Sequence, residues 1–326
     1  MDVMRKKILI AQSISRNGID LLEEKGYEPM YAQSEDRDHI KEMIRGCHGA
    51  ISKTFFLDRE ILSCAPDLKV IGKHGIGVDN VVSVTDATAL GICVCNTPVA
   101  NCHSVAEHTM GFLIALAKHF GRMDRAVRAN DFGITDRLFA GELKGKTLGL
   151  VGLGNIGKIV ARMAHMGFEM TVIAYDPYAD GNPDYVSMTD DLDTLLAQSD
   201  FVSLHVPAIP QTNRMIGLAQ IRKMKLGAYL VNCARGSVVD ENALALALRE
   251  NLIRGAALDV YESEPPAPDH PLLALPNVIL TPHSAALSEE ALFNMSYYAA
   301  MGVDEVLSGK KPTWCVNWDS IEHEQD

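Results

Sequence analysis

Short apolar runs alternate with helical patterns along almost the whole chain. In the first hundred residues, four such runs predict buried strands, at 8–11, 50–52, 70–72 and 92–95. Apolar residues at helical spacing lie between them and predict helices that stop at Gly26 and Gly46, and Asp58 is placed to cap a short helix. Strands that are apolar throughout and are separated by helices indicate a parallel sheet covered on both faces.

The same alternation begins again in the middle of the chain. Six apolar runs predict further strands, at 147–151, 171–175, 201–205, 228–232, 255–259 and 278–280. Between the two series we expect a helix that Ser104 and Glu107 open with a capping box and that reaches Phe120, followed by a polar, irregular segment over 121–146. Two features close the chain: a helix over about 288–308, and an acidic tail after Ile321 that is expected to be disordered.

Composition narrows the class of protein. The 326 residues are enough for two domains, and 42 acidic against 30 basic side chains give a formal net charge of −12. This charge argues against binding to nucleic acid or to an anionic membrane surface. Seven cysteines without a C-x-x-C pair indicate reduced thiols in a cytoplasmic protein with no bound metal. The apolar runs are too short for a signal peptide or for the ~18 residues of a membrane span.

A glycine-rich motif directly follows one predicted strand. Gly152-Leu153-Gly154-Asn155-Ile156-Gly157 fits G-x-G-x-x-G and opens a predicted helix, which is the context of a dinucleotide site. Gly152 allows the turn, Gly154 lets the backbone approach a pyrophosphate, and Gly157 lets the helix pack closely. Asp176 ends the next strand and can accept hydrogen bonds from the ribose hydroxyls. The sequence therefore predicts NAD as cofactor and disfavours NADP, whose phosphate a carboxylate repels.

Three titratable or charged residues follow later strands. Arg235, Glu264 and His283 come soon after the runs at 228–232, 255–259 and 278–280. Ligands of open α/β sheets bind beyond the carboxyl ends of the strands, so these side chains can converge beside a nicotinamide. Three other histidines in similar places are expected to be structural: His74, His108 and His205.

Six motifs follow one another along the chain, at 73–80, 104–108, 152–157, 232–236, 259–265 and 281–283. In them the sequence resembles the D-isomer-specific 2-hydroxyacid dehydrogenases, the family of phosphoglycerate, hydroxypyruvate, glyoxylate and D-lactate dehydrogenases. The resemblance implies an α/β fold of two doubly wound parallel-sheet domains with the active site in the cleft between them. A Rossmann NAD-binding domain, 101–286, would be inserted into a flavodoxin-like substrate domain made of 1–100 and 287–326.

The resemblance also implies roles for the residues already singled out. His283 would protonate the carbonyl oxygen of a 2-oxo acid as hydride arrives, and would act as the base in reverse. Glu264 would hold the imidazole and favour its charged form, and Arg235 would bind the substrate carboxylate and carbonyl. Backbone N–H groups of Gly75, Ile76 and Gly77 would cradle the carboxylate.

Further positions match residues that line the cofactor in this family. They are Ile76, Val206, Pro207, Thr212, Cys233, Ala234, Arg235, Asp259, His283 and Ala285. The family often has glycine where this chain has Ala285, so we expect the backbone beside the cofactor to be shifted there. The resemblance also suggests a homodimer formed through the nucleotide domains, with the helix over 104–120 and the segment after it at the interface.

The substrate is expected to be a small unphosphorylated 2-oxo acid such as hydroxypyruvate or glyoxylate. Family members acting on 3-phosphoglycerate typically carry R-S-x-T-K-V where this chain has the segment 52–57, with Ser52 at the Arg and Phe56 at the Lys. Two cations that could hold a phosphate are thereby missing. Lys53 and Lys73 remain nearby, so a phosphoglycerate dehydrogenase stays an alternative, and Phe55 and Phe56 could instead be core residues.

Two alternatives concern the activity itself. The C-terminal-binding-protein corepressors share the fold that the resemblance implies and bind peptides in response to NADH, and a formate or phosphite dehydrogenase would use a similar cleft. The fold alone does not choose among them. The presence of Arg235, Glu264 and His283 together favours the 2-hydroxyacid dehydrogenase.

Overall fold

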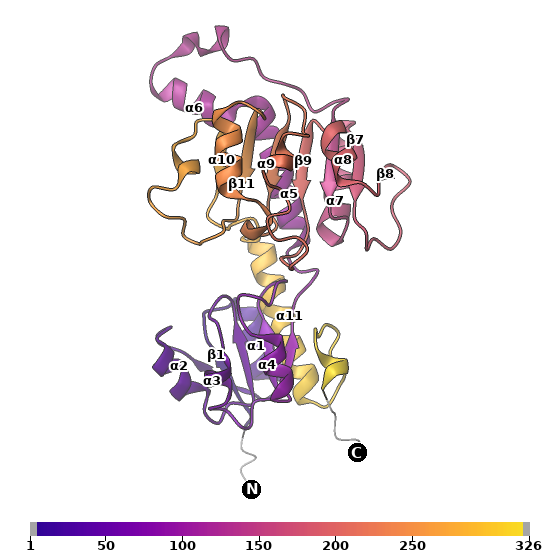
Figure 1. Cartoon of the computed structure of the whole chain (residues 1–326). Helices are drawn as coiled ribbons and strands as arrows, with labels where there is room; N and C mark the ends of the chain where they lie inside the picture. The colour runs from indigo at the N-terminus through magenta and orange to yellow at the C-terminus, as the bar shows by residue number, and fades with distance from the viewer. Residues whose placement is uncertain (1–4, 322–326) are drawn as a thin grey trace. The chain divides into compact units, whose positions relative to one another are not determined.

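The computed structural model describes residues 5–321, which leaves the acidic tail after Ile321 outside the described residues. The chain divides into two compact units, 1–101 with 287–326, and 102–286. Each unit is an α/β layer structure built on one parallel sheet (Figure 1), which confirms the α/β class and the two parallel-sheet domains. Among residues 5–321, no helix has both the length and the apolar composition needed to cross a bilayer.

The first unit has a five-stranded parallel sheet in the order β2-β1-β3-β4-β5, the flavodoxin-like arrangement. Its strands are β1 (Lys7–Ile10), β2 (Glu28–Tyr31), β3 (Gly49–Ser52), β4 (Val70–Lys73) and β5 (Cys93–Cys95). Its helices are α1 (Arg16–Glu24), α2 (Arg37–Ile44), α3 (Arg59–Leu62), α4 (Val84–Ala89) and α11 (Glu289–Leu307). Asp58 caps α3 as the sequence predicts, because its carboxylate accepts a 3.0 Å hydrogen bond from the N–H of Ile61.

Helix α11 joins this unit from the far end of the chain. With α1 it buries apolar side chains against one face of the sheet, while α2, α3 and α4 cover the other face. Gly72 in β4 permits the close approach of α11, since a Cβ there would lie 2.9 Å from the carbonyl oxygen of Ala299. The apolar runs are thus buried on both sides, which explains why they do not alternate with polar residues.

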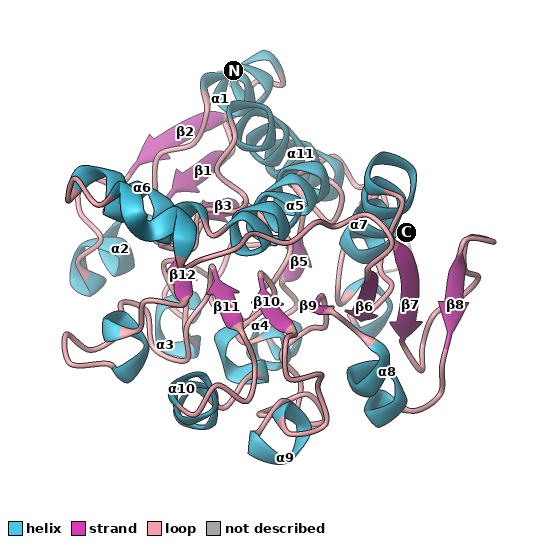
Figure 2. Cartoon of the chain, turned by 90° about the horizontal axis from the view of Figure 1, so that it is seen from above, coloured by secondary structure: helices cyan, strands magenta, loops and turns pink. Residues whose placement is uncertain are grey.

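The second unit has a seven-stranded parallel sheet in the order β12-β11-β10-β9-β6-β7-β8 (Figure 2). Its strands are β6 (Thr147–Val151), β7 (Thr171–Tyr175), β8 (Val186–Met188), β9 (Phe201–Leu204), β10 (Tyr229–Asn232), β11 (Gly255–Leu258) and β12 (Val278–Leu280). Its helices are α5 (Cys102–Lys118), α6 (Phe120–Arg128), α7 (Asn155–Phe168), α8 (Leu192–Gln198), α9 (Leu218–Ile221) and α10 (Glu241–Arg249). The sequence predicts six of these strands.

Helices cover both faces of this sheet. Helices α5 and α7 lie on one face, and α8, α9 and α10 on the other (Figure 2). Apolar residues of the first pair form one buried cluster with the strands, and those of the other three form a second. The sheet changes direction between β6 and β9. From β6 the chain adds β7 and β8 toward one edge, and from β9 it adds β10, β11 and β12 toward the other. In a doubly wound sheet, this switch point is where a dinucleotide binds.

Strands β2 and β8 and helices α4 and α6 were not expected from the sequence. Strands β2 and β8 are edge strands whose residues are mostly outside the core, so they lack the apolar run that identifies their buried neighbours. The segment 121–146 was expected to be irregular, yet α6 forms within it. Most residues of α6 are polar, and Ala126 is its only buried residue, so the segment lacks the apolar run by which its neighbours were identified.

The predicted capping box at Ser104 is wrong. Helix α5 begins two residues earlier, at Cys102, which places Ser104 inside the helix. The hydroxyl of Ser104 donates a 2.7 Å hydrogen bond to the carbonyl oxygen of Ala285 instead of capping a free N–H. A tertiary contact thus uses a side chain whose local sequence pattern predicted a helix start.

Candidate active site

The glycine-rich loop joins β6 to α7 in the manner that its sequence predicts. Gly152 has a φ of +98°, and a Cβ there would lie 2.6 Å from the carbonyl oxygen of His205. A Cβ on Gly157 would lie 2.4 Å from the oxygen of Gly152, so both glycines are required by the protein itself. Gly154 differs, because a Cβ there would have no atom of the described chain within 4 Å.

The open side of Gly154 fits a bound phosphate group. Gly154 is also the N-cap of α7 and makes no side-chain capping hydrogen bond, so the start of the helix directs backbone N–H groups outward. Free N–H groups and the positive end of the helix dipole suit an anion. The residues of this loop therefore fit the pyrophosphate of a dinucleotide.

Asp176 lies beside this loop at the end of β7. One carboxylate oxygen accepts a 2.8 Å hydrogen bond from the N–H of Leu153, and the other accepts a 2.9 Å bond from the N–H of Tyr178. These bonds fix the carboxylate next to the glycine-rich loop and leave further lone pairs on both oxygens. The side chain can accept hydrogen bonds from a diol in this position, and it places negative charge where a phosphate would otherwise bind.

The loop after β10 carries Arg235. Asn232, buried at the end of the strand, donates to the carbonyl oxygen of Arg235 at 2.9 Å and accepts from the N–H of Ala234 at 3.0 Å. The guanidinium donates a 2.8 Å hydrogen bond to the oxygen of Ala234. This local clamp sets the direction of the backbone from which Arg235 projects, at the carboxyl edge of the sheet.

Gly236 brings the Arg235 loop against the loop after β11. A Cβ on Gly236 would lie 1.9 Å from the carbonyl carbon of Tyr261, a distance that no side chain can have. The loop after β11 also carries Glu264, one of whose carboxylate oxygens accepts a 3.0 Å hydrogen bond from the N–H of Tyr261. Two loops that lie about thirty residues apart in sequence are therefore fixed to one another by their backbones.

The central pair of the site is His283 and Glu264. Nδ1 of His283 lies 2.7 Å from Oε2 of Glu264, and both side chains are partly exposed, at 43% and 38%. A carboxylate on Nδ1 leaves Nε2 of the same ring to exchange a proton with a ligand. The arrangement is that of a general acid or base whose orientation is fixed by a carboxylate.

The charge state of Glu264 follows from its neighbours. Burial by itself raises the pKa of this carboxyl group, but hydrogen bonds from His283 and from the N–H of Tyr261 outweigh burial. The charges of His283 and Arg235 act in the same direction, and the net result is a pKa below the ordinary value of 4.5. Glu264 is therefore ionised at neutral pH and supports a positive charge on the imidazole.

Asp259 holds the backbone around His283. Its buried carboxylate accepts hydrogen bonds from the hydroxyl of Thr281 and from the N–H groups of Ser284 and Ala285, the last two at 2.8 and 2.9 Å. Its carbonyl oxygen accepts from the N–H of His283 at 2.8 Å. His283 has a φ of +53°, an uncommon conformation for a residue with a side chain, and these bonds hold it there.

Five other predicted cofactor positions lie at the same edge of the sheet: Val206, Pro207 and Thr212 in the segment after β9, and Cys233 and Ala234 directly after β10. Ala285 comes after β12, and Ile76 belongs to the first unit. Thr212 donates to the carbonyl oxygen of Pro207 and accepts a 3.0 Å bond from the N–H of Ile209, which closes the loop that begins at Val206. Cys233 is buried, and burial raises the pKa of its thiol to about 12, so it remains protonated. A contact of these residues with a cofactor remains a prediction.

The predicted carboxylate cradle, 75–77, belongs to the first unit and follows β4. Gly75 has a φ of +135°, and its N–H already donates a 3.1 Å hydrogen bond to the hydroxyl of Thr97. Within residues 5–321, the N–H groups of Ile76 and Gly77 have no hydrogen-bond acceptor. Asn96 holds this loop by donating a 2.8 Å bond to the carbonyl oxygen of Ile76. Two free donors, rather than three, are thus available for an anion.

The three histidines expected to be structural have partners in the protein. Nε2 of His74 lies 3.1 Å from the hydroxyl of Ser296, and Nε2 of His205 lies 2.9 Å from that of Ser203. Burial lowers the pKa of both rings to about 4, so they are neutral at physiological pH. His108 packs edge-on against Phe112, and its Nε2 lies 3.2 Å from the hydroxyl of Thr281.

Sequence reasoning missed the residues that position the site rather than line it. Asn232 and Gly236 were included in a motif without a role, and Glu241 was not considered. Glu241 is buried, accepts a 2.9 Å hydrogen bond from the N–H of Glu262, and lies 2.9 Å from Nε2 of His270. A polar residue at the last position of a fully apolar strand, as in Asn232, is the signal that could have identified one of them.

Comparisons with known proteins agree with this geometry. Residues 110–285 match the family model described as the NAD-binding domain of D-isomer specific 2-hydroxyacid dehydrogenases. The D-3-phosphoglycerate dehydrogenase of Archaeoglobus fulgidus is 39% identical over 97% of this chain, which spans only 60% of that protein. The glyoxylate reductase of Thermofilum pendens is 38% identical, with 96% of this chain and 95% of that protein covered.

Solved structures show the same architecture over the whole chain. A Thermus thermophilus protein matches with a TM-score of 0.86 and 34% identity, covering 95% of this chain and 99% of its own. The NADPH-dependent glyoxylate/hydroxypyruvate reductase of Sinorhizobium meliloti matches with a TM-score of 0.87 and 27% identity, covering 98% of this chain and all of its own, 100%. Sequence, fold and the glycine-rich loop agree, and the chain belongs to the D-isomer specific 2-hydroxyacid dehydrogenase family and carries its NAD-binding domain.

Proposed function

We propose that this protein is an NAD(H)-dependent dehydrogenase that interconverts a small 2-oxo acid and its D-2-hydroxy acid. The observation that carries the proposal is the 2.7 Å hydrogen bond between His283 and an ionised Glu264. A protein that only senses NADH has no need for an oriented acid–base pair at the carboxyl edge of its nucleotide domain. This pair favours an enzyme over a corepressor-like binding protein.

The proposed roles follow from the chemistry of each side chain. His283, protonated and held by Glu264, gives its Nε2 proton to the carbonyl oxygen of the substrate, and takes it back when the hydroxy acid is oxidised. Arg235 binds the substrate carboxylate, because its planar fork can donate to two oxygens at once. The bound nicotinamide supplies or accepts the hydride.

The carboxylate of the substrate is proposed to receive further donors from the loop after β4. The N–H groups of Ile76 and Gly77 are available, whereas that of Gly75 is used by Thr97. Two backbone donors and a guanidinium suffice for the two oxygens of a carboxylate.

NADH rather than NADPH is the proposed cofactor, although a solved neighbour is named NADPH-dependent. Asp176 is held beside the glycine-rich loop by two backbone N–H groups, and its carboxylate disfavours a 2′-phosphate. Loop residues Val206, Pro207, Thr212, Cys233, Ala234 and Ala285 would complete the cofactor site.

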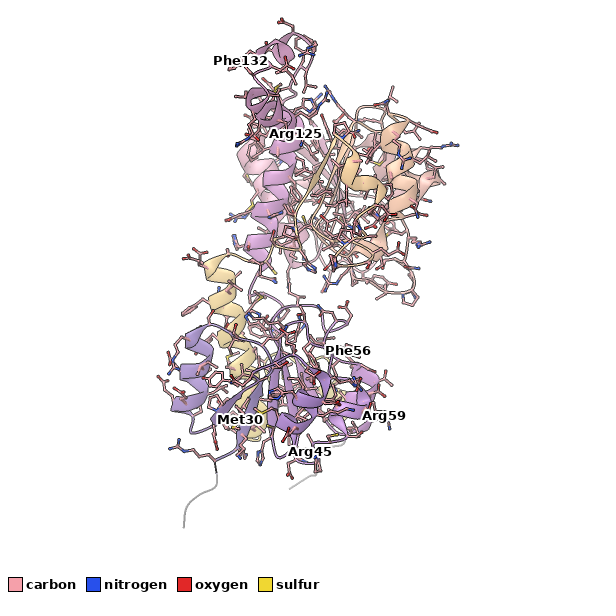
Figure 3. All side chains as sticks on the ribbon, turned by 90° about the vertical axis from the view of Figure 1, so that its left-hand side faces the viewer. Met30, Arg45, Phe56, Arg59, Arg125 and Phe132 are labelled. Atoms are coloured by element: carbon pink, nitrogen blue, oxygen red, sulfur yellow. The ribbon has the colours of Figure 1, made fainter. Side chains whose placement is uncertain are left out.

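The proposed substrate is unphosphorylated, of the hydroxypyruvate or glyoxylate type. Ser52 stands where a phosphate-binding arginine is expected; it is fully buried and its hydroxyl donates to the carbonyl oxygen of Phe55 at 2.9 Å. Phe56 stands where the lysine is expected and is 44% exposed, so it presents an apolar ring (Figure 3). An exposed aromatic ring favours a substrate without a phosphate group.

A phosphoglycerate dehydrogenase remains the second candidate because two lysines lie near this segment. The ammonium group of Lys73 donates to the carbonyl oxygen of Lys53, and burial lowers the pKa of Lys53. Relatives named D-3-phosphoglycerate dehydrogenase also match nearly the whole chain. Lys53 and Lys73 could therefore supply the positive charge that Ser52 and Phe56 do not.

Kinetics with matched substrates test the proposal and decide between these candidates. We expect loss of NADH absorbance with hydroxypyruvate and glyoxylate, and kcat/KM no higher for 3-phosphohydroxypyruvate than for hydroxypyruvate. A preference of about tenfold for the phosphorylated acid, or about 1.4 kcal/mol, would establish the second candidate. NADH binding without turnover of any 2-oxo acid would support the corepressor-like reading, and NAD reduction by formate or phosphite would support a different dehydrogenase.

We further propose that the protein is a homodimer through its nucleotide domain. Helix α6 and the segment after it project from the body of the second unit (Figure 1), and they expose apolar side chains. These are Phe120, Val127, Phe132 and Phe139, which are 56%, 52%, 68% and 70% exposed. Exposed aromatic and other large apolar side chains gathered on one projecting segment are typical of a protein interface. Sedimentation equilibrium should give twice the monomer mass.

A further inference from the structure

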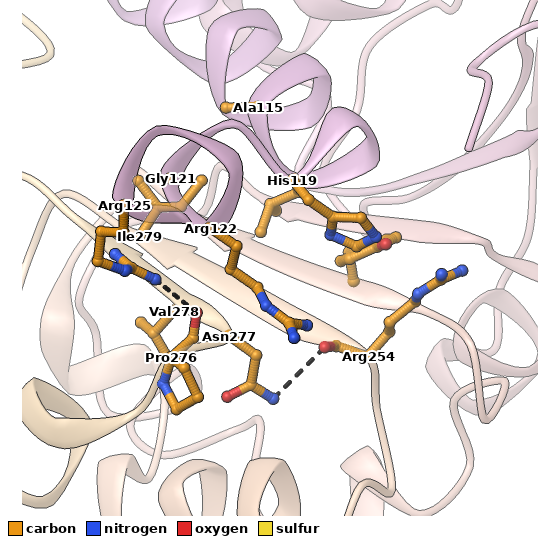
Figure 4. Close-up of a pocket in the computed structure, with 13 residues that line it drawn as sticks. Ala115, His119, Gly121, Arg122, Arg125, Arg254, Pro276, Asn277, Val278 and Ile279 are labelled. Atoms are coloured by element: carbon orange, nitrogen blue, oxygen red, sulfur yellow. Dashed lines mark hydrogen bonds between the residues drawn. The ribbon is translucent and has the colours of Figure 1, made fainter. Parts of the chain in front are cut away.

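A small pocket lies at the edge of the second unit's sheet that is opposite to the dinucleotide loop (Figure 4). Tyr229, Gly255 and Val278, the first residues of β10, β11 and β12, form its floor. The end of α5 and the start of α6 form its wall. Because all seven strands are parallel, this amino-terminal edge is separated from the carboxyl-terminal edge by the full length of the strands.

Three arginines line this pocket. Arg125 donates a 3.0 Å hydrogen bond to the carbonyl oxygen of Pro276, Arg254 donates one of 3.2 Å to the oxygen of Phe139, and Arg122 is the third. Within the described residues, none of the three forms an ion pair with a carboxylate. The acid nearest in sequence, Asp124, pairs with Arg128 at 2.8 Å.

This cluster opposes the charge of the whole chain, whose formal net charge is −12. Acidic side chains outnumber basic ones, 42 to 30, so unpaired arginines would be expected to find carboxylates nearby. Arg125 is near the carboxylate of Asp124, which itself pairs with Arg128. Guanidinium groups gathered in one pocket repel one another, and that repulsion is relieved when an anion binds. The concentration of positive charge therefore indicates an anionic ligand.

His119 provides an independent indication of a ligand. Its side chain is among those that line the pocket, it is only 9% exposed, and its buried Nε2 has no hydrogen-bond partner in the described chain. Burial lowers the pKa of the ring, and the charges of Arg254 and Arg122 lower it further, so the imidazole is neutral. A buried ring nitrogen without a partner costs free energy that a hydrogen bond to a ligand would recover.

We propose that this pocket binds a small oxyanion, a carboxylate or phosphate group, at a site separate from the dinucleotide and the catalytic pair. The cavity of about 50 Å³ has room for a few water molecules or for one such group, but not for a nucleotide. The oxyanion accepts hydrogen bonds from the guanidinium groups, and from Nε2 of His119 in the tautomer whose one proton is on that nitrogen. Arginine suits this role because its planar fork donates to two oxygens.

The proposal is tested by calorimetric titration of the full chain, saturated with NADH, with inorganic phosphate and separately with acetate. Arg122→Gln and Arg254→Gln each remove one charge from the pocket, and we expect each to weaken binding of the preferred anion at least tenfold. Arg128→Gln is the matched control, because Arg128 lies on the same helix α6 but pairs with Asp124. It should bind the anion as the native protein does.

The outcomes separate the sources of the anion. Tighter binding of phosphate or of acetate identifies which oxyanion the pocket prefers. Either result supports the proposal if Arg122→Gln and Arg254→Gln both lose binding of that anion. Equal binding by all four proteins, or no binding by the native one, overturns it. A fall of Arg122→Gln and Arg254→Gln to monomers, with no anion binding to the native protein, also overturns it, because an acidic group of a second copy would then occupy the pocket.

A second readout covers the case in which a variant does not fold. The His119 ring resonances of the native protein should shift on addition of the preferred anion, and should not shift in Arg254→Gln. Unchanged His119 resonances in the native protein at saturating phosphate and acetate would overturn the proposal without the use of any variant.

Discussion

Gly236 meets the backbone of Tyr261 so closely that a Cβ on it would lie 1.9 Å from the Tyr261 carbonyl carbon. This contact fixes the loop that carries Arg235 to the loop that carries Glu264. The spacing of the proposed carboxylate-binding and acid–base groups therefore depends on a residue that bears no functional group of its own.

Gly236→Ala is expected to push the two loops apart. The methyl group collides with backbone rather than with a flexible side chain, so the loops must move, and we expect kcat/KM to fall at least tenfold and Tm to decrease. Gly154→Ala is the matched control, since its methyl group enters open space. It should keep the native Tm and weaken only NADH binding, as measured by fluorescence titration. A Gly236→Ala enzyme of native activity would show that the contact is dispensable.

The acid–base pair gives a prediction for two variants. His283→Ala should lower kcat by roughly 10²–10⁴, the range for loss of a positioned general acid, while NADH binding remains. Glu264→Gln removes the negative charge that supports the imidazolium, so the alkaline limb of the profile for 2-oxo acid reduction should move to lower pH. Glu262→Gln, a neighbouring exposed acid that pairs with Arg214, is the control. An unchanged profile in Glu264→Gln would refute its role.

The pKa of Glu264 also predicts the acid side of the same profile. Because the folded-state pKa lies below the ordinary 4.5, the carboxylate stays ionised, and its support of the imidazolium is complete, above that value. The support is lost only as the pH falls through the depressed pKa. Activity should therefore persist below pH 4.5 for as long as the protein remains folded, as measured by initial rates across a buffer series. In Glu264→Gln, the loss of activity that accompanies protonation of Glu264 at acid pH should be absent.

Arg235→Lys tests the binding of the substrate carboxylate. Lysine keeps the charge but cannot donate to two oxygens in one plane, so kcat/KM for 2-oxo acids should fall at least tenfold, or about 1.4 kcal/mol. Arg214→Lys is the control, because that guanidinium pairs with Glu262 on the surface. A similar mild effect of both changes would mean that another group holds the carboxylate.

Asp176→Ala tests the choice of cofactor. The native enzyme should have a much higher kcat/KM with NADH than with NADPH, and the variant should narrow that ratio by removing the repulsion of the 2′-phosphate. Some loss of activity with NADH is also expected, because the carboxylate holds the N–H of Leu153 in the glycine-rich loop. Asp180→Ala, an exposed acid four residues later, should leave the ratio unchanged. Equal use of both cofactors by the native enzyme contradicts the prediction.

Much of this fold is predictable because the determining signals are local. Buried parallel strands such as β6 and β10 are apolar at every position, and the glycines at 152, 154 and 157 follow a strand directly. Asp176 ends the strand after that loop, so all the residues that predict the dinucleotide site lie within one continuous segment of the sequence. Arg235, Glu264 and His283 could be chosen because each follows a strand whose carboxyl end lies at the same edge.

Other features depend on contacts between distant parts of the chain, and local sequence does not encode them. Ser104 matches the pattern of a helix start, yet its hydroxyl donates a hydrogen bond to the carbonyl oxygen of Ala285, far along the chain. Asp259 matches a cofactor position, yet its carboxylate holds the backbone around His283. Edge strands β2 and β8 lack an apolar pattern because most of their residues lie outside the core, whereas the edge strands β5 and β12 keep apolar residues and were predicted.

The sequence by itself determined the alternation of strands and helices, the dinucleotide motif and the identity of the proposed acid, base and cation. Only the tertiary structure decided that Gly236 locks two loops together and that His119 and three arginines meet at the far edge of the sheet. The physical reason is that periodicity and turn chemistry act over a few residues. Close backbone approach and unpaired charge exist only after residues more than a hundred positions apart, such as Arg122 and Arg254, have been brought together by folding.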